Sequence, residues 1–502
     1  MPCPIIPFPQ ELRPQLPTIV GNVDYLTLRQ RLEQIDALLR DGGVERDFVQ
    51  RALERWNPEG RRKVTAREQG KYQQRSRRAL RCTILRTLVQ EDYRGFSCQL
   101  AGHPLYQWFC QVDALDVVRV PSKSELQRFA HWLPADQMRP VLDALLRVAV
   151  EKPRTLRLAE PLDVEAYFLD STCLAANIHF PTDWVLLRDG VRTLMKATGL
   201  IRRAGLRGRM QAPEAFLRQM NRWSIQMSQQ GRRCGSKKER KRVLRQMKKL
   251  VGVVRGHARR HRDLLDRRWA ETPWTRAQAE QVLRRIDGVL ELLPRAQKQA
   301  HERIIGNRPV ANNEKILSLY DPDVHVIVRG KAGAEVEFGN TVLLGENRQG
   351  VILDYEIFRE SAPADSNLVF GSLLRVWEGT GEHVGAVVGD RGFASADNSR
   401  TLKEGGTFDG LCPRKPAELR RRMKSAKFAR LQRRRAQTEG RIGILKRGFL
   451  GRPMRAKGFP RRELALAWGV LTHNLWMLAR LRKVAKKRKQ AVEREVPLPA
   501  AA

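Results

Sequence analysis

Apolar positions in the first third of the chain recur at helical spacing. Between residues 24 and 150 no strong strand signal appears, and one apolar stripe is formed by Leu26, Leu32, Ile35, Leu38 and Leu39. Ser122, which follows Pro121, is typical of a helix start. We therefore expect an extended arm over residues 1–23, because six of the first 17 residues are Pro, and an all-α N-terminal domain over 24–155. The pattern admits a helix-turn-helix in this domain but places no recognition helix.

Near Val164 the pattern changes from helices to strands. Residues 166–172, Ala-Tyr-Phe-Leu-Asp-Ser-Thr, predict a buried strand that carries a carboxylate. Thr182 and Asp183 then begin an apolar helix, and helical, basic sequence continues to about residue 305. Strand patterns resume after this helical block, over 324–329, 334–344 and 350–358.

The last third of the chain alternates helices and short strands. The expected elements are a helix over 365–377, a strand over 384–388, a helix over 394–403, a strand over 407–412 and a long basic helix over 417–447. The final helix carries on one face Leu464, Trp468, Leu471, Leu475 and Leu478. Without the helical block, three antiparallel strands are followed by alternating elements, β-β-β-α-β-α-β-α, which is the ribonuclease-H-like order.

These elements predict an α+β, mixed fold with an all-α N-terminal domain and a ribonuclease-H-like core. The core is expected to hold a mixed five-stranded sheet with helices, and a helical insertion to interrupt it. We place the core at 156–180 and 311–460, the basic insertion at 181–310, and a C-terminal helix with a basic tail at 461–502.

The charge of the chain is concentrated in two blocks. The 502 residues include 94 Lys and Arg against 54 Asp and Glu, a formal charge of +40. Residues 201–270 contain 22 basic and 4 acidic residues, and residues 413–490 contain 26 basic and 3 acidic ones, so the rest of the chain nets −1. A folded protein with such basic blocks needs a polyanionic partner, of which nucleic acid is the commonest. Two solvated helical faces are the alternative.

A membrane partner is not expected. The longest uncharged apolar stretch, 464–479, contains Thr472, His473 and Asn474 and is shorter than the roughly 20 residues of a membrane span. Seven scattered cysteines without a Cys-x-x-Cys pair suit a reducing compartment, so we expect a cytoplasmic protein.

Two predicted strands end on aspartates, and a helix supplies a glutamate. Asp170 lies near the end of the first strand, Asp390 follows the fourth, and Glu439 lies on the long basic helix. In the expected topology the first and fourth strands are neighbours and the helix packs across the sheet, so the three carboxylates converge. Converging acids repel one another, and two divalent cations roughly 4 Å apart relieve that repulsion in phosphodiester chemistry. Mg²⁺ suits such ligands, so we expect two Mg²⁺ ions here, with Mn²⁺ as a substitute.

Each acid also has an ordinary explanation. Glu439 alone would be an ion-pair partner on an Arg-rich helix, Asp170 a strand-end residue, and Asp390 a turn residue in Gly-Asp-Arg-Gly-Phe. The joint order of strand Asp, strand Asp and helix Glu favours a shared site over three separate explanations. Among competing carboxylates, Asp183 and Asp365 are interpreted as helix caps, and Asp354 as a strand residue.

Basic residues accompany these acids. Arg435 lies four residues before Glu439 and Lys446 seven after it, so at 100° per residue the three fall within about 40–60° of one line. Cations placed there would hold the phosphates of a scissile strand. We expect further DNA contacts from three residues close to the predicted strands: Arg391, Arg329 and Lys331.

Four sequence features together resemble the DDE transposases of bacterial insertion sequences, in particular the ISNCY-type group. They are Leu169–Thr172, Asn177–Asp183, Gly389–Phe393 and the Arg435-x3-Glu439-x6-Lys446 spacing, and the resemblance spans roughly residues 80–480. It implies a ribonuclease-H-like core, Mg²⁺-dependent DNA cleavage and strand transfer, and a catalytic, metal-binding role for Asp170, Asp390 and Glu439. Related signatures often begin with Tyr, where this chain has Gln432.

The resemblance also implies the partners. They are double-stranded DNA at transposon terminal inverted repeats and at the target, with the protein a homodimer or higher oligomer in the bacterial nucleoid. Insertions of this kind contact transposon ends, and some use an aromatic wedge; Trp223, Trp269 and Trp274 are candidates, with core packing as the alternative. Two other functions stay open: a non-catalytic, domesticated or regulatory DNA-binding protein, and a related nuclease without strand transfer.

Overall fold

The computed structural model describes residues 15–114, 117–229, 236–331, 334–451 and 454–482. The N-terminal part is helical, as the apolar spacing predicts: α1 Val23–Asp41, α2 Val44–Trp56, α3 Ala66–Val89, α4 Tyr93–Gly102, α5 Pro104–Cys110, α6 Lys123–Ala130 and α7 Ala135–Glu151. Ser122 caps α6 by accepting from the Glu125 backbone N–H, which confirms the predicted helix start. A two-stranded pair, β1 Asp113–Ala114 and β2 Val117–Val118, was not predicted because two-residue strands leave no periodic signal. The first 14 residues of the predicted extended arm lie outside the described residues.

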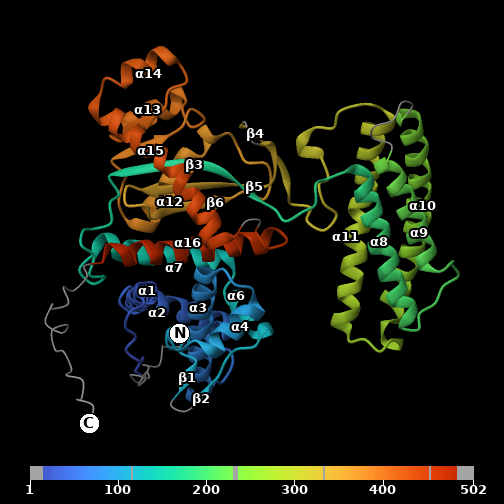
Figure 1. The fold of residues 1–502 in the computed structure, drawn as a ribbon, viewed down its shortest axis with the longest axis horizontal. Coiled ribbons are helices and arrows are strands. Elements are labelled where there is room, and N and C mark those ends of the chain that lie inside the picture. Colours follow the sequence, from blue (N-terminus) through green and yellow to red (C-terminus); the bar gives the residue numbers. More distant parts are fainter. Residues whose placement is uncertain (1–14, 115–116, 230–235, 332–333, 452–453, 483–502) are drawn as a thin grey trace, which may run out of the picture.

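A mixed sheet forms the centre of the molecule (Figure 1). Its strands are β3 Ala166–Ala175, β4 His325–Lys331, β5 Ala334–Asn347, β6 Ile352–Ile357, β7 Ala386–Gly389 and β8 Phe408–Leu411. The order is β4-β5-β3-β7-β8, with β6 also paired to β5; β3 is antiparallel to β5 and parallel to β7. The first strand, β3, therefore lies at the centre of the sheet, and β7, the strand predicted over 384–388, lies beside it.

The described sheet has six strands, so the predicted five-stranded sheet is wrong, although the strand patterns in the sequence cover all six ranges. The reason is the length of β5, which spans 14 residues. The edge of β5 away from β3 pairs with β4 up to Gly339 and with β6 from Val342 onward. Two short strands thus share one edge of a long one.

Helices cover the sheet and continue the alternation that the sequence predicts. They are α12 Val369–Thr380, α13 Ala396–Glu404, α14 Pro416–Arg422, α15 Ala426–Leu445 and α16 Phe459–Leu481. The single long helix predicted over 417–447 is wrong, because the chain breaks at 423–425 and Ser425 caps a new helix through the Phe428 backbone N–H. A π-helical turn, Lys446–Leu450, extends α15.

The helical block after β3 forms four helices with a core of their own. They are α8 Asp183–Arg203, α9 Pro213–Gln229, α10 Ser236–Arg268 and α11 Arg276–Ala300, which stand apart from the sheet in Figure 1. Trp223, Trp269 and Trp274 are half-buried against this core, which favours packing over an exposed wedge. The interpretation of Asp183 as a helix cap is wrong, because Thr182 holds the cap position and the Asp183 carboxylate instead accepts from Arg303 at 2.9 Å.

The last described helix joins the sheet to the N-terminal helices. In Figure 1, α16 runs between the sheet and α1, α3 and α7, which it contacts. The predicted apolar face of α16 is buried, and the Trp468 indole N–H donates to the Ala130 carbonyl at 3.0 Å. Asn474 exchanges two hydrogen bonds with the backbone of Ile352 in β6. The N-terminal helices and the sheet therefore share one core, and no helix in the described part of the chain is long and apolar enough to cross a membrane.

Candidate functional site

The register of the sheet places two aspartates at the same level of neighbouring strands. The apolar run of β3 pairs in parallel with β7, and Phe168 lies opposite Val388. Asp170 and Asp390 each follow this pair by two residues. Asp390 comes just after β7 ends, whereas Asp170 lies in the middle of β3, which continues to Ala175, so its prediction as a strand-end residue is wrong. Both are half-buried. The meeting of the two predicted aspartates thus follows from strand pairing.

The turn that holds Asp390 is tight. The Gly392 backbone N–H donates to Asp390 Oδ1 at 2.8 Å, as in a turn built around an aspartate. A Cβ at Gly392 would lie 2.7 Å from Asp365 Oδ2 and 3.0 Å from Asp390 Oδ1. The glycine therefore lets two carboxylates approach the same turn.

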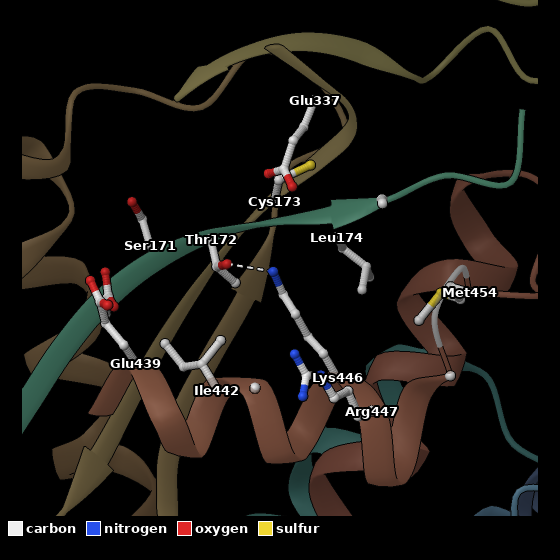
Figure 2. Close-up of a pocket in the computed structure, with 14 residues that line it drawn as sticks. Ser171, Thr172, Cys173, Leu174, Glu337, Glu439, Ile442, Lys446, Arg447 and Met454 are labelled. Atoms are coloured by element: carbon white, nitrogen blue, oxygen red, sulfur yellow. Dashed lines mark hydrogen bonds between the residues drawn. The ribbon is translucent and has the colours of Figure 1, made fainter. Parts of the chain in front are cut away.

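Glu439 reaches the sheet from α15, which packs on β3, β7 and β8. The apolar face of α15 is buried, whereas Glu439 lies at its edge and is exposed. Glu439 and Asp170 line one cavity of about 250 Å³, and Figure 2 shows the Glu439 side chain directed toward β3. Asp170 and Glu439, which are far apart in the sequence, therefore border one cavity, and Asp390 follows the strand beside β3.

Asp390 and Glu439 both act on the electrostatics of Asp170. Burial, and then the negative charges of Asp390 and Glu439, raise the pKa of Asp170 to about 6. A hydrogen bond from the Ser171 backbone and the positive charge of Arg435 act in the opposite direction. Charging Asp170 is thus unfavourable unless a cation is added.

Lys446 lines this cavity, and Arg435 lies on α15 one turn before Glu439. Lys446 Nζ donates to Thr172 Oγ1 on β3 at 2.6 Å, which Figure 2 shows as a dashed line. Arg435 Nε donates to Gln432 Oε1 at 3.2 Å, and Gln432 Nε2 donates to the Gly410 carbonyl of β8 at 2.7 Å. Gln432 therefore ties Arg435 to the sheet. Sequence reasoning missed this link, although it singled out Gln432 as a departure from the usual Tyr.

The structure says less about the other three predicted DNA-contacting residues. Arg391 is exposed next to Asp390, and its carbonyl accepts from Arg414 Nε at 3.2 Å. Arg329 and Lys331 belong to β4, but their side chains lie outside the described part of the structure. DNA binding by these three residues stays a prediction.

Two competing carboxylates have different surroundings. Asp354 is a fully buried strand residue of β6, as predicted, and it pairs with Arg139 and Arg375. The interpretation of Asp365 as a helix cap is wrong, because its Oδ2 accepts from Ser171 Oγ at 3.3 Å, beside Asp170. Spacing alone suggested a cap, since Asp365 starts a short turn before α12.

The carboxylates suit a hard divalent cation by their chemistry. Oxygen ligands are what Mg²⁺ prefers, and a bound cation would favour the ionised form of Asp170, whose pKa is raised by burial and by the two neighbouring acids. Among the described residues, no group of three or more His, Cys, Asp or Glu side chains is placed to hold a metal ion. Metal binding by the three acids therefore stays a prediction.

Comparison with known proteins adds one finding. Neither the curated proteins nor the solved structures gave a match to the chain. A family model does match, over a segment that runs from β5 to most of α16 and includes Asp390 and Glu439 but begins after Asp170. Residues 341–475 match the model described as Transposase DDE domain, which supports a transposase of the DDE type.

Proposed function

We propose that the protein is a DNA transposase that binds transposon ends and catalyses phosphodiester hydrolysis and strand transfer. The observation that carries the proposal is the approach of Asp170, Asp390 and Glu439 beside the paired strands β3 and β7, with two of the acids within the matched segment. The central position of β3 and its parallel pairing with β7 support a ribonuclease-H-like core. Membership of the ISNCY-type group stays a prediction, as do the domain boundaries.

Asp170, Asp390 and Glu439 would hold two Mg²⁺ ions, for which Mn²⁺ would substitute. Bound there, the ions would supply Lewis-acid activation of a water or 3′-hydroxyl and stabilisation of the leaving oxygen. The shape of the site supports this role, because the cavity opens beside Asp170 and Glu439 and leaves room for a substrate phosphate.

The chain's own cations would position the scissile strand. The ammonium group of Lys446 donates a hydrogen bond to Thr172 on β3, and its positive charge would attract a phosphate of the strand at the carboxylates. Arg435, held by Gln432, presents a planar guanidinium that suits bidentate phosphate binding. The two side chains lie on either side of Glu439 in the sequence, so the strand would lie across the carboxylates.

The test uses duplexes taken from the DNA on either side of the coding segment, where terminal inverted repeats are expected. Wild-type protein should nick such ends with Mg²⁺ or Mn²⁺ and not with EDTA. Asp170→Asn, Asp390→Asn and Glu439→Gln should each lower cleavage by at least 10³-fold, about 4 kcal/mol of barrier, while end binding persists. Normal cleavage by any of the three variants would remove that residue from the site.

The two alternative functions give different outcomes in the same system. Precut ends incubated with a target duplex should be joined to it by a transposase, whereas a nuclease would only hydrolyse. Binding of the ends without cleavage in any divalent metal would identify a non-catalytic DNA-binding protein. Light scattering of the protein bound to an end would test the proposed homodimer or higher oligomer.

A further inference from the structure

A second, larger groove lies beside the carboxylate cavity and has not been given a role. It measures about 810 Å³ and lies where α3, α4 and α6 meet the segment from Arg447 to Trp468. We call it the basic groove. Its cationic lining consists mainly of Arg86, Arg447, Arg455, Lys457 and Arg461.

The basic groove carries these five cations against two acids. Within the described residues, none of the five basic side chains forms an ion pair with a carboxylate. Of the two acids, Asp92 caps α4 through the Arg94 and Gly95 backbone N–H groups and lies close enough to Arg455 for their charges to interact, whereas Glu91 accepts from Gln99. An excess of cations on a groove favours an anionic ligand.

The remaining lining is aromatic and apolar. Tyr93, Phe449 and Trp468 line the groove, and the Arg86 guanidinium lies 4.5 Å from the centre of the Tyr93 ring. The Trp468 ring is held in place by its hydrogen bond to Ala130. Phe449 and Trp468 are largely buried, so the apolar surface between the cations comes from Tyr93 and from the partly exposed Leu450, Ala456 and Ala465. Apolar surface between cations suits the bases and phosphates of a single strand.

The basic groove is continuous with the carboxylate cavity. Arg447, Gly451 and Met454 line both. Met454 is fixed at the junction, where its backbone pairs with Ala176 just after β3. A nucleic-acid strand that passes the carboxylates can therefore continue into the groove without leaving the protein surface.

We propose that the basic groove binds an unpaired stretch of one DNA strand adjacent to the scissile phosphate. This inference rests on the proposed function, because it takes the DNA at the carboxylates as given. The interactions that it invokes differ from those at the carboxylates: the groove would bind phosphates through exposed arginines and bases through its apolar floor. An acidic peptide is the competing occupant. Its carboxylates would contact the cations of the groove, but it has no bases to place against the apolar floor.

The experiment measures DNA binding in EDTA, so that no strand is cut. The probes are a fluorescent blunt duplex and the same duplex with a single-stranded extension. The variant is Arg455→Ala/Arg461→Ala, whose two side chains are exposed, and the matched control is Arg61→Ala, an exposed arginine in the loop after α2. Lys457→Gln serves as a second groove variant, and thermal unfolding verifies that each protein is folded.

The double variant should bind the extended probe about ten-fold more weakly at 0.15 M salt, with a salt slope smaller by about 1.4, as expected for two lost single-strand phosphate contacts. Its affinity for the blunt duplex, and both affinities of the control, should change less than two-fold. Neutral methylphosphonates in the extension should weaken wild-type binding and leave the double variant unaffected.

Three outcomes would overturn the inference. They are an equal loss on blunt and extended probes, no loss on either, and displacement of the extension by polyglutamate with no effect of methylphosphonates. Because the binding is measured without metal, its result is independent of cleavage. A protein that cuts and joins ends but shows no extension-specific loss would refute the groove alone, and one that shows the loss without cutting would refute the proposed transposase alone.

Discussion

Replacing Asp170 with Asn tests whether the three carboxylates repel one another in the folded protein. Burial and the charges of Asp390 and Glu439 raise the pKa of Asp170 from 3.8 to about 6. At about 1.4 kcal/mol per pKa unit, this rise corresponds to roughly 3 kcal/mol of lost stability once the group is ionised. Asn has nearly the same shape and no charge. Asp170→Asn should therefore be about 2–3 kcal/mol more stable than the wild type at pH 8 in EDTA.

The effect should depend on pH with a defined sign. Because the folded pKa of Asp170 lies above the unfolded value, the folded chain binds this proton more tightly. The destabilisation is absent near pH 4, grows as the pH rises toward about 6, and is constant above it. The stability difference between Asp170→Asn and the wild type should follow the same curve.

Urea unfolding followed by tryptophan fluorescence measures this difference at several pH values. Asp397→Asn, which removes an exposed carboxylate on α13, is the matched control and should change stability by less than about 0.5 kcal/mol. The reasoning is refuted if Asp170→Asn is no more stable than the wild type at pH 8, or if its advantage is the same at pH 4.

Three further substitutions probe other parts of the structure. Asp354→Asn should lower the free energy of unfolding by about 3 kcal/mol near pH 7, because two arginines hold the pKa of this buried carboxyl down, and the loss should shrink in acid as that pKa is approached; a loss that grows in acid would contradict this. Gly345→Ala places a methyl group 1.7 Å from a buried tyrosine hydroxyl and should cost about 1–3 kcal/mol in a thermal melt, whereas Gly252→Ala, in open space on α10, should not destabilise; equal melts would refute the packing. Gln432→Leu removes the link from α15 to β8 and should cost about 1–2 kcal/mol in urea unfolding; an unchanged midpoint would show that the link is not formed.

The strands around the site could be predicted because their apolar runs are short and bounded by polar residues. Asp390 was identified as a carboxylate that follows a strand, whereas β3 continues beyond Asp170, which was predicted near a strand end. The pairing of Phe168 with Val388 accounts for the approach of the two aspartates. Glu439 was singled out by its rarity in a basic helix. What the sequence expressed clearly was the order of elements and the residue types at their ends.

The features that the sequence did not predict depend on tertiary contacts. The sixth strand arises because β5 is long enough for two partners, and nothing local distinguishes a paired edge from a free one. The break before α15 depends on Ser425 accepting from Phe428 rather than continuing the helix. Asp365 and Ser171 meet only after folding, since 194 residues separate them.

The basic groove was only partly predictable from the sequence. Four of its five cations, between Arg447 and Arg461, belong to the basic block over 413–490 that the charge count identified, whereas Arg86 comes from α3. The charge count pointed to nucleic acid as the partner. Only the fold shows that part of the charge collects beside the carboxylates.

Binding of Mn²⁺ to the protein on its end DNA is the measurement that decides whether Asp170, Asp390 and Glu439 form one metal site. Electron paramagnetic resonance counts the bound ions in the wild type and in Asp170→Asn, Asp390→Asn and Glu439→Gln, with Asp397→Asn as the control. A shared site predicts that the wild type and the control bind alike, and that each of the three variants loses at least ten-fold in affinity, about 1.4 kcal/mol. Unchanged Mn²⁺ binding in all three variants would contradict the shared site.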